Sequence, residues 1–421
     1  MKRIVFASLF LLLAGVTLRA ADYDVRKYGA KGDGVKMNTE AIQKAIDACS
    51  KAGGGRVVLS DGVYLTGPIQ LKDGVDLHLE RTARLLASPN IEDFPDWKDV
   101  KHVNSENLPR GNRNACMIFA DEAERIAITG HGVIDGNGTH HIVPLEKPGN
   151  SGKWFFKRKY PNEKTLPRVV FFAGCKDVVI EDVTMTNQPS GWSYWIHDCD
   201  RVMMRGLHIL AELRYPNNDG IHINCSRDVT VSDCHIQTGD DCIIIRANSR
   251  SLKENKPLER VVVTNCILRT CCYGIRIAFC NDGVMRNCTF SNLVITDSRD
   301  GIGITLPNSS YPRNYDFGRE KSLVENMVFS NIVMDGIYGR PIYAFMKDKN
   351  EVDAVRDIHF SNIRATANHF PIFCGREGNP LQRFSFDNCS FVRVSEPGQK
   401  EDIIFQHVEG FVFNNTTFET R

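Results

Sequence analysis

Acidic residues cluster in two short segments, and each segment leads directly into an apolar run. Asn217-Asn218-Asp219-Gly220 precedes Ile221-His222-Ile223, and Gly239-Asp240-Asp241-Cys242 precedes Ile243-Ile244-Ile245. If the two runs are matched strands of neighbouring rungs, Asp219 and Asp241 share one column and are displaced by one rung, or about 4.8 Å. The sequence therefore predicts that Asp219, Asp240 and Asp241 crowd one patch of surface.

Crowded carboxylates suit acid–base chemistry. Mutual repulsion raises the proton affinity of one member while another stays ionised, which supplies a general acid and a general base near neutral pH. Two other interpretations are open. Asp-Gly and Gly-Asp pairs are common turn residues, and clustered carboxylates also bind calcium. Two stacked acidic turns cost self-repulsion, which favours a functional site over turn chemistry alone.

Short apolar runs, each interrupted by a polar pair, recur along the chain and predict the element that positions these acids. The spacing lies mostly in the twenties to low thirties of residues, and such units must stack because each is too short to bury an apolar face alone. An Asn at the recurrent turn tolerates the left-handed backbone of a tight corner. The pattern predicts an all-β, single-stranded parallel β-helix, since Leu spacing for a horseshoe and hairpin signals for a propeller are missing. Examples are Val263-Thr264-Asn265-Cys266, Phe290-Ser291-Asn292-Leu293, Phe329-Ser330-Asn331-Ile332, Phe360-Ser361-Asn362-Ile363 and Phe386-Asp387-Asn388-Cys389.

One amphipathic helix is expected before the rungs. Asn38 can cap it, Gly53-Gly54-Gly55 can end it, and its apolar stripe follows helical spacing at Ile42, Ala45, Ile46 and Cys49. We expect this helix to cover the open N-terminal end of the solenoid.

The first residues indicate export. Lys2 and Arg3 precede an apolar run, residues 4–16, and a small-residue exit, which is typical of a signal peptide over residues 1–20 and too short for a membrane anchor. We expect residues 21–421 to form one domain, secreted or periplasmic, and monomeric. The 14 Cys are scattered, several within apolar runs, so most are expected to be buried thiols, with Cys271-Cys272 as the pair to test for oxidation.

The bulk numbers exclude some partners. A formal net charge of +1 gives no reason to expect nucleic acid or an anionic membrane as a partner. The Cys and His spacing does not resemble a zinc site, and no metal or other cofactor is expected.

The chain resembles the polygalacturonase family of glycoside hydrolases, glycoside hydrolase family 28, over nearly its whole mature length. The start, residues 23–34 and 62–68, is similar, but the Asn-x-Asp-Gly and Gly-Asp-Asp-Cys pair is far more specific. The resemblance implies a pectin-lyase-like right-handed β-helix and inverting hydrolysis of α-linked galacturonic acid in pectin. In that mechanism Asp240 is the general acid, and Asp219 and Asp241 activate water.

Two departures from the family pattern bear on the substrate. Cys272-Tyr273-Gly274 stands where the family has Gly-His-Gly, and Gly303-Ile304-Thr305 stands where it has Arg-Ile-Lys. Both usual cations for the substrate carboxylate are therefore missing. Members of the family that cleave rhamnogalacturonan also lack the His, so the departures favour rhamnogalacturonan or branched pectin, or exo action.

Strand matching suggests where replacement cations lie. Side chains alternate along a strand, so outward residues form columns across rungs. Arg276 falls in the column of Gly303, and Arg246 in the column of Thr305, so we expect Arg276, with Arg246, to bind a uronate carboxylate through a two-pronged hydrogen bond. Further expected substrate contacts, each also explicable as simple packing, are Tyr273, Trp195 and His222, while Asp300 continues the carboxylate column.

Two other observations leave alternatives open. The stretch 137–168 is either a solvated loop or a basic, aromatic wall beside a groove; it contains His140, His141, Trp154, Phe155, Phe156, Lys157, Arg158 and Lys159. A calcium-dependent pectate-type lyase and a non-catalytic glycan-binding β-helix are the rival functions. An unsaturated product and EDTA sensitivity would favour the lyase.

Overall fold

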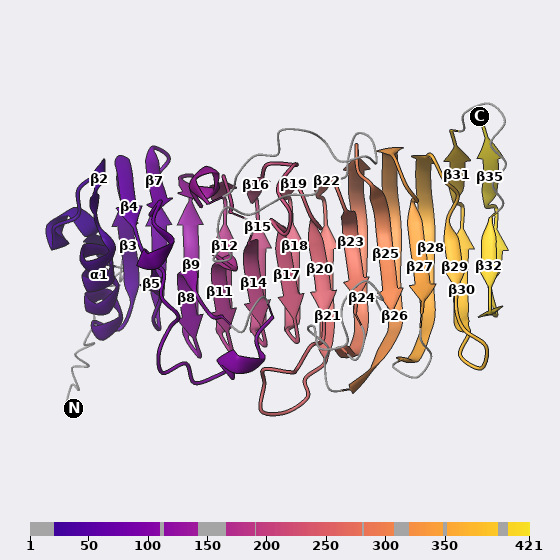
Figure 1. Ribbon diagram of the computed structural model, residues 1–421, viewed down its shortest axis with the longest axis horizontal. Coiled ribbons are helices and arrows are strands. Elements are labelled where there is room, and N and C mark those ends of the chain that lie inside the picture. The colour runs from indigo at the N-terminus through magenta and orange to yellow at the C-terminus, as the bar shows by residue number, and fades with distance from the viewer. Residues whose placement is uncertain are drawn as a thin grey trace, which may run out of the picture.

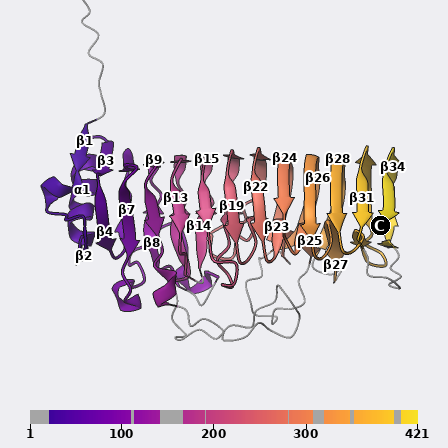
Figure 2. The ribbon, with the colours of Figure 1, turned by 90° about the horizontal axis from the view of Figure 1, so that it is seen from above.

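The chain folds into an elongated stack of parallel strands, seen from two sides in Figure 1 and Figure 2. The structure, a computed structural model, describes residues 21–109, 113–141, 166–189, 191–279, 282–306, 320–347, 352–394 and 403–421. The expected signal peptide, residues 1–20, lies outside these ranges. Within them every strand pairing outside one isolated bridge is parallel, and the strands wind as a right-handed β-helix, the fold that the repeat predicted.

One face of the solenoid is an 11-stranded sheet, which we call the site sheet because it carries all the predicted site residues. Neighbouring strands pair in register from one end to the other. The strands, in spatial order, are β5 (Ile69–Gln70), β8 (Cys116–Asp121), β11 (Arg168–Ala173), β14 (Trp192–His197), β17 (Ile221–Asn224), β20 (Ile243–Arg246), β23 (Tyr273–Ala278), β25 (Asp300–Leu306), β27 (Ile342–Met346), β29 (Ile372–Cys374) and β32 (Ile404–Gln406).

The other two faces are two ladders of strands that merge where long strands bend around a corner. The merging strands are β24 (Asp282–Thr296), β26 (Glu320–Ile337) and β28 (Val352–Ala367). One ladder also contains β1 (Asp22–Asp24), β3 (Gly55–Leu59), β6 (Val75–Leu79), β9 (Glu124–Gly130), β12 (Lys176–Glu181), β15 (Asp200–Arg205), β18 (Arg227–Ser232), β21 (Leu258–Thr264), β30 (Leu381–Asp387), β33 (Val408–Glu409) and β34 (Val412–Asn414). The second contains β2 (Asp33–Met37), β4 (Gly62–Thr66), β7 (Ala83–Ala87), β10 (Val133–Asp135), β13 (Thr184–Thr186), β16 (His208–Leu210), β19 (His235–Thr238), β22 (Ile267–Thr270), β31 (Ser390–Arg393) and β35 (Thr417–Thr420).

The core consists of inward side chains that stack on their equivalents in the next rung. The Phe of the repeated motif forms such a column, with ring centroids 4.7 Å apart for Phe290 and Phe329, and 5.0 Å apart for Phe329 and Phe360. Phe386 continues it at 5.0 Å from Phe360. Because each ring contacts rings in both neighbouring rungs, burial is continuous along the solenoid although no rung has a core of its own.

Recurrent corners contain Asn in the left-handed conformation, as the repeat predicted. Asn292, Asn331 and Asn362 have φ values of 54°, 54° and 53°. Each side-chain amide donates to the Asn carbonyl of the preceding rung, at 3.2 Å from Asn331 to Asn292 and 2.9 Å from Asn362 to Asn331. The corner residue thus fulfils two requirements, a positive φ and a ladder of hydrogen bonds.

The predicted helix is α1 (Thr39–Lys51), at the N-terminal end of the stack (Figure 1), with Ile42, Ala45, Ile46 and Cys49 buried. Asn38 stands at the predicted N-cap position of α1, but the capping contact expected of its side chain is wrong. The side chain of Asn38 does not bond the helix N-terminus; it accepts from the Lys31 N–H at 2.7 Å and donates to the Lys31 carbonyl at 3.0 Å. Asn38 therefore fastens the preceding loop rather than the helix.

The cysteines of the described ranges are all free thiols, and all except Cys272 are buried. Cys271 and Cys272 are not bonded to each other. The prediction that thiols pack as small apolar residues is confirmed for these positions. No helix in the described part of the chain is long and apolar enough to cross a membrane.

Candidate active site

Strand register brings the three predicted carboxylates together at the N-terminal ends of β17 and β20. Ile221 pairs with Ile243, which places Asp219 beside Asp241, and the Gly220 N–H donates to the Asp241 carbonyl at 3.0 Å. The two glycines of the motifs allow this approach. A Cβ at Gly220 would lie 2.3 Å from the carbonyl oxygen of Cys242, and one at Gly239 would lie 2.1 Å from that of Tyr215.

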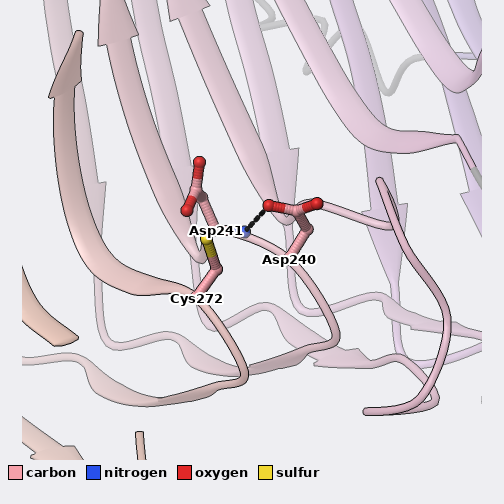
Figure 3. Close-up of side chains that lie close together, drawn as sticks. All are labelled: Asp240, Asp241 and Cys272. Carbon is pink, nitrogen blue, oxygen red and sulfur yellow. Dashed lines mark hydrogen bonds between the residues drawn. The ribbon is translucent and has the colours of Figure 1, made fainter. Parts of the chain in front are cut away.

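Asp240 is held by backbone donors from both acidic segments. One carboxylate oxygen accepts the Asn217 N–H at 3.0 Å, and the other accepts the Asp241 N–H at 3.0 Å, a bond drawn in Figure 3. Burial, followed by the negative charges of Asp219 and Asp241, raises the pKa of Asp240 to about 7. This carboxyl therefore retains its proton through weakly acidic conditions.

Asp241 lies in the opposite environment. Its carboxylate accepts from Arg276 Nη1 at 2.8 Å and from the Tyr273 N–H at 3.0 Å, and the Cys272 thiol lies beside it (Figure 3). Burial opposes ionisation of Asp241, but the Arg276 charge and the hydrogen bonds from Cys272, Arg276 and Tyr273 outweigh it, so the pKa of Asp241 lies below its ordinary value. Two adjacent residues of the chain thus have carboxyls with opposite pKa shifts.

Asp219 is bound by His222, a residue that the sequence assigned to substrate contact. His222 Nε2 lies 2.7 Å from Asp219 Oδ2, and the His222 ring stacks on Trp192 with centroids 3.9 Å apart. Both side chains are almost fully buried, at 4% and 6% exposure. His222 therefore orients Asp219 through its ring nitrogen, and the substrate contact expected of His222 stays a prediction.

The structure confirms the predicted columns of outward residues, because the strands that carry them pair in the predicted register. His222, Ile244, Arg276 and Gly303 pair in succession along the site sheet. Asn224 pairs with Arg246, and Ala278 pairs with Thr305. The alternation of side chains along parallel strands was therefore sufficient to place both arginines on this face.

Arg246 is paired with a carboxylate of the protein itself. Its Nε and Nη2 each donate at 2.8 Å to an oxygen of Asp282, and the Arg246 side chain is only 5% exposed. Phe279 lies against both arginines, with its centroid 4.1 Å from the Arg246 guanidinium carbon and 4.4 Å from that of Arg276. Arg246 makes a two-pronged bond to Asp282, because a buried guanidinium needs a carboxylate partner, and its part in binding substrate stays a prediction.

Trp195 lies in aromatic packing. Its ring stacks on Phe171 at 4.5 Å and on His197 at 4.7 Å, and the Arg168 guanidinium lies 4.3 Å from its centroid. Only 2% of the residue is exposed, so Trp195 is packed among its neighbours, and the sugar contact expected of it stays a prediction. The alternative that the sequence left open, burial, is the one observed.

Residues 94–109, the wall segment, cover the outward face of the site sheet on the N-terminal side of the acids. The Lys101 N–H donates to Asp121 at 2.7 Å, and His102 Nε2 lies 2.9 Å from Asp198. The Asn104 N–H donates to the Ser251 carbonyl at 2.8 Å. The wall segment therefore spans from the end of β8 to the loop after β20, and it shields β8, β11 and β14 from solvent.

A pocket lies between the wall segment and the acid-bearing rungs. It is a small pocket, partly open to solvent, and its lining includes Pro109, Trp192, Trp195, His222, Arg246 and Ser251. His222 belongs both to this lining and to the Asp219 pair, so the pocket is contiguous with the candidate active site.

Three contributors were missed by sequence reasoning. Trp192 supports His222, Asp282 binds Arg246, and Cys272 lies beside Asp241. The column of Asp219 would have indicated Trp192, since Tyr194 pairs with Ile221. Asp282 had no such signal, because it follows a turn in which Phe279 has a φ of 97°, a conformation that strand periodicity does not foresee.

Most of the stretch 137–168 lies outside the described residues, including Trp154, Phe155, Phe156, Lys157, Arg158 and Lys159. Its beginning is described. His140 Nδ1 lies 2.7 Å from Asn137 Oδ1, and the buried His141 lies 3.3 Å from the Ser88 carbonyl. The contact of His141 with Ser88 holds the start of the stretch against a neighbouring rung. The basic, aromatic side of a groove that the sequence offered for residues 137–168 stays a prediction; it is separate from the wall segment.

In the described part of the chain, Asp240, Asp241 and Cys272 bring one potential ligand atom each within 4.8 Å of one another. The donor set suits calcium poorly. Calcium takes six to eight oxygen ligands, whereas this group offers a thiol, and one of its carboxylates is already paired with Arg276.

Comparison with known proteins identifies the family. The model of glycosyl hydrolases family 28 matches residues 59–406, so the chain belongs to this family. A probable polygalacturonase of Vitis vinifera is 28% identical over 306 residues, covering 69% of this chain and 58% of the relative. An exo-poly-alpha-D-galacturonosidase of Dickeya chrysanthemi is 28% identical over 277 residues, covering 58% of this chain and 45% of the relative. The chain thus spans about half the length of these two relatives.

A solved structure supports the fold. A hyperthermoactive exopolygalacturonase from Thermotoga maritima superposes with a TM-score of 0.71 at 22% identity, covering 94% of this chain and 92% of that one. At this identity the superposition bears on architecture alone.

Proposed function

We propose that this protein is an exported glycoside hydrolase that cleaves α-linked galacturonic acid-containing pectin with inversion, by exo action. The observation that carries the proposal is the pair of adjacent carboxyls with opposite pKa shifts, Asp240 raised to about 7 and Asp241 lowered beside Arg276. A protonated acid next to an ionised base is the arrangement that glycosidic cleavage requires. Family 28 membership supports the same reaction.

In this mechanism each residue has one role. Asp240 donates its proton to the glycosidic oxygen as the bond to the anomeric carbon breaks. Asp241, ionised by Arg276, and Asp219, oriented by His222, accept a proton from the attacking water. Because the bonds that the described residues make to the Asp240 carboxyl come from two backbone N–H groups, its proton can leave without breaking an ion pair.

Spacing bears on the stereochemistry. Oxygens of Asp240 and Asp241 lie within 4.8 Å, which is closer than the carboxyl separation of about 6.5–9.5 Å that leaves room for a water in inverting enzymes. We therefore propose Asp219, on the neighbouring rung, as the carboxylate that holds the attacking water together with Asp241. NMR of the first-formed product anomer tests inversion, and retained configuration would contradict it.

Asp240→Asn tests the catalytic assignment. The amide cannot deliver a proton, so we expect kcat to fall by about 10² to 10⁴-fold on galacturonan oligosaccharides, with binding kept. In the unmodified enzyme, activity should decline as the pH rises through about 7, since Asp240 then loses the proton that it must donate. Assays of newly formed reducing ends over a pH series measure both the loss of kcat in the variant and the decline of the wild-type rate. A wild-type rate that keeps rising above pH 8 would contradict the assignment.

Exo action is proposed from the wall segment. Within the described residues it covers the sheet on the N-terminal side of the acids and bonds to Ser251, which hinders a sugar chain from extending past the acids in that direction. We expect a time course on a hexagalacturonide to release one short product throughout, whereas internal cleavage would give mixed intermediate lengths. Rhamnogalacturonan and branched oligosaccharides, the other substrates indicated by the sequence, belong in the same panel.

A further inference from the structure

A histidine lies between two carboxylates at the edge of the site sheet opposite the acids. The acids precede β17 and β20, whereas His102 of the wall segment lies where β8, β11 and β14 end. His102 Nε2 lies 2.9 Å from Asp198 Oδ2, and His102 Nδ1 lies 3.3 Å from Glu122 Oε1. The proposed mechanism uses none of these three side chains.

Strand register places the two carboxylates on either side of a glycine. Glu122, Gly174 and Asp198 directly follow paired residues of β8, β11 and β14, so they form a column with one rung between neighbours. Gly174 has a φ of 64°, and a Cβ there would lie 2.3 Å from His102 Nδ1. The absence of a side chain at residue 174 therefore makes the space in which the imidazole bridges two outer rungs.

This arrangement suits the charged form of the ring. A neutral imidazole has one donor and one acceptor, whereas an imidazolium has two donors. Because each ring nitrogen of His102 faces a carboxylate, only the protonated ring can donate to both. Burial opposes the charge on His102, but the hydrogen bond and charge of Asp198, and then those of Glu122, outweigh it, so the pKa of His102 lies above its ordinary value. The stabilisation is therefore present below the ordinary pKa and is lost as the pH rises through the raised one.

Two other titratable groups act on this site from neighbouring elements. Burial lowers the pKa of His197, at the end of β14, to about 3, so that ring stays neutral. The pKa of Lys256, in the loop after β20, is raised by its bond to Glu254 and also by the charge of Asp198, so it stays a cation. Neither group changes its charge between pH 6 and 8.5. In the described part of the chain, the further charged residues around His102 are Asp121 of β8 and Lys98, Asp99 and Lys101 of the wall segment.

The wall segment also has an apolar side that packs on the site sheet. Val103 and Leu108 are buried in a cluster with Phe119 and Phe171, which lie on β8 and β11. Because this packing involves no charge, it holds the wall segment at every pH. The side chain of His102 adds the part of the attachment that depends on a proton.

We propose that His102 is a proton-dependent anchor of the wall segment. With its ring protonated, His102 bridges Glu122 and Asp198 and holds the segment closed over the site sheet. With the ring neutral, one of the two bonds is lost and the segment opens more often. Because Pro109 of the same segment lines the pocket beside His222, the anchor governs how firmly that side of the pocket is held. The inference goes beyond the proposed function and does not depend on it, since the wall segment opens and closes without substrate.

Hydrogen–deuterium exchange of the intact protein, read by mass spectrometry, tests the anchor. Each exchange rate of peptides covering residues 95–109 is divided by the chemical exchange rate at the same pH, which gives a protection factor. In wild type this factor should fall about tenfold or more between pH 6 and 8.5, as expected for the loss of a hydrogen bond to a charged group. In His102→Gln it should be low at pH 6 already and change less than about twofold. His131→Gln, which alters an exposed His in the turn after β9, is the matched control and should follow wild type.

A second variant keeps the test decisive if His102→Gln does not fold, which thermal melts report. Asp198→Asn removes the nearer carboxylate and should move the midpoint of the change to lower pH. A wild-type protection factor that is constant with pH would overturn the inference, as would His102→Gln with the wild-type pH dependence. An equal loss of protection in β30, several rungs away, would also overturn it, because the change would then be global. An inactive wild type with the pH-dependent wall segment intact would reject the hydrolase alone.

Discussion

At the residue scale, the site works by giving neighbouring carboxyls different partners. The Asp240 carboxyl accepts from two neutral backbone N–H groups and lies near two negative charges, whose effect exceeds that of the Arg276 charge, whereas Asp241 pairs directly with this guanidinium. The chemistry of the residues is identical, so the difference between acid and base lies entirely in their surroundings. Coupled carboxyls titrate as a group, and a change at one partner should therefore appear in the pH profile of the whole site.

Arg276→Met tests this coupling. Removing the cation takes away the main stabilisation of ionised Asp241, so the pKa of Asp241 should rise. Because Asp241 must be ionised to act as base, the acidic limb of kcat/KM should move to higher pH, while the alkaline limb, set by Asp240, should persist. A pH–rate series on oligogalacturonide measures both limbs. An unmoved acidic limb would contradict the role given to Arg276.

The sequence predicted the positions of these residues better than their partners. The columns of Asp219 with Asp241, and of Arg276 with Gly303, follow from the two-residue alternation of strands, which turns cannot alter once the rungs are in register. The partners of Arg246 and His222 depend on side-chain direction and on residues after turns. No periodicity encodes these, so the sequence did not predict that Arg246 pairs with Asp282 or that His222 binds Asp219.

At the element scale, the Asn corners keep successive rungs aligned, and alignment is what places the carboxylates. Asn331 has a φ of 54°, donates to Asn292 at 3.2 Å and accepts from Asn362 at 2.9 Å. Its two contributions can be separated by substitution, because Gly accepts the left-handed conformation while Ala does not.

We expect Asn331→Gly to lose only the ladder bonds, and Asn331→Ala to lose the bonds and add the left-handed penalty. That penalty is about 1–2 kcal/mol, offset in part by the entropy of Gly, about 0.5–1 kcal/mol. The Ala variant should therefore be less stable than the Gly variant by several tenths to about 1 kcal/mol. Urea unfolding of the three proteins measures this. Equal or reversed stabilities would show that the corner conformation is not what Asn331 contributes.

At the scale of the whole molecule, the solenoid is a one-dimensional stack in which each rung contacts only its neighbours. The repeat predicted this architecture because the apolar spacing recurs along most of the chain, and the capping helix followed from its own stripe of four apolar residues. The wall segment was not predicted. Its residues 94–109 contain neither strand alternation nor a long helical stripe, and their positions depend on contacts such as His102 with Asp198.

Because each rung contacts only its neighbours, a core substitution several rungs from the acids should affect stability but not activity. Phe360 is fully buried, with its ring 5.0 Å from both Phe329 and Phe386, and it lies in β28, several rungs beyond the acids. Phe360→Ala leaves a cavity and should cost about 3–5 kcal/mol of unfolding free energy. Because contacts run only between adjacent rungs, the loss should lower the melting temperature while kcat/KM at 25 °C stays within about twofold. Calorimetry and initial rates on the same preparation measure the two effects. A large fall in kcat/KM in a protein that is still folded would mean that strain passes along the stack to Asp240, and the rungs could then no longer be treated as independent beyond their neighbours.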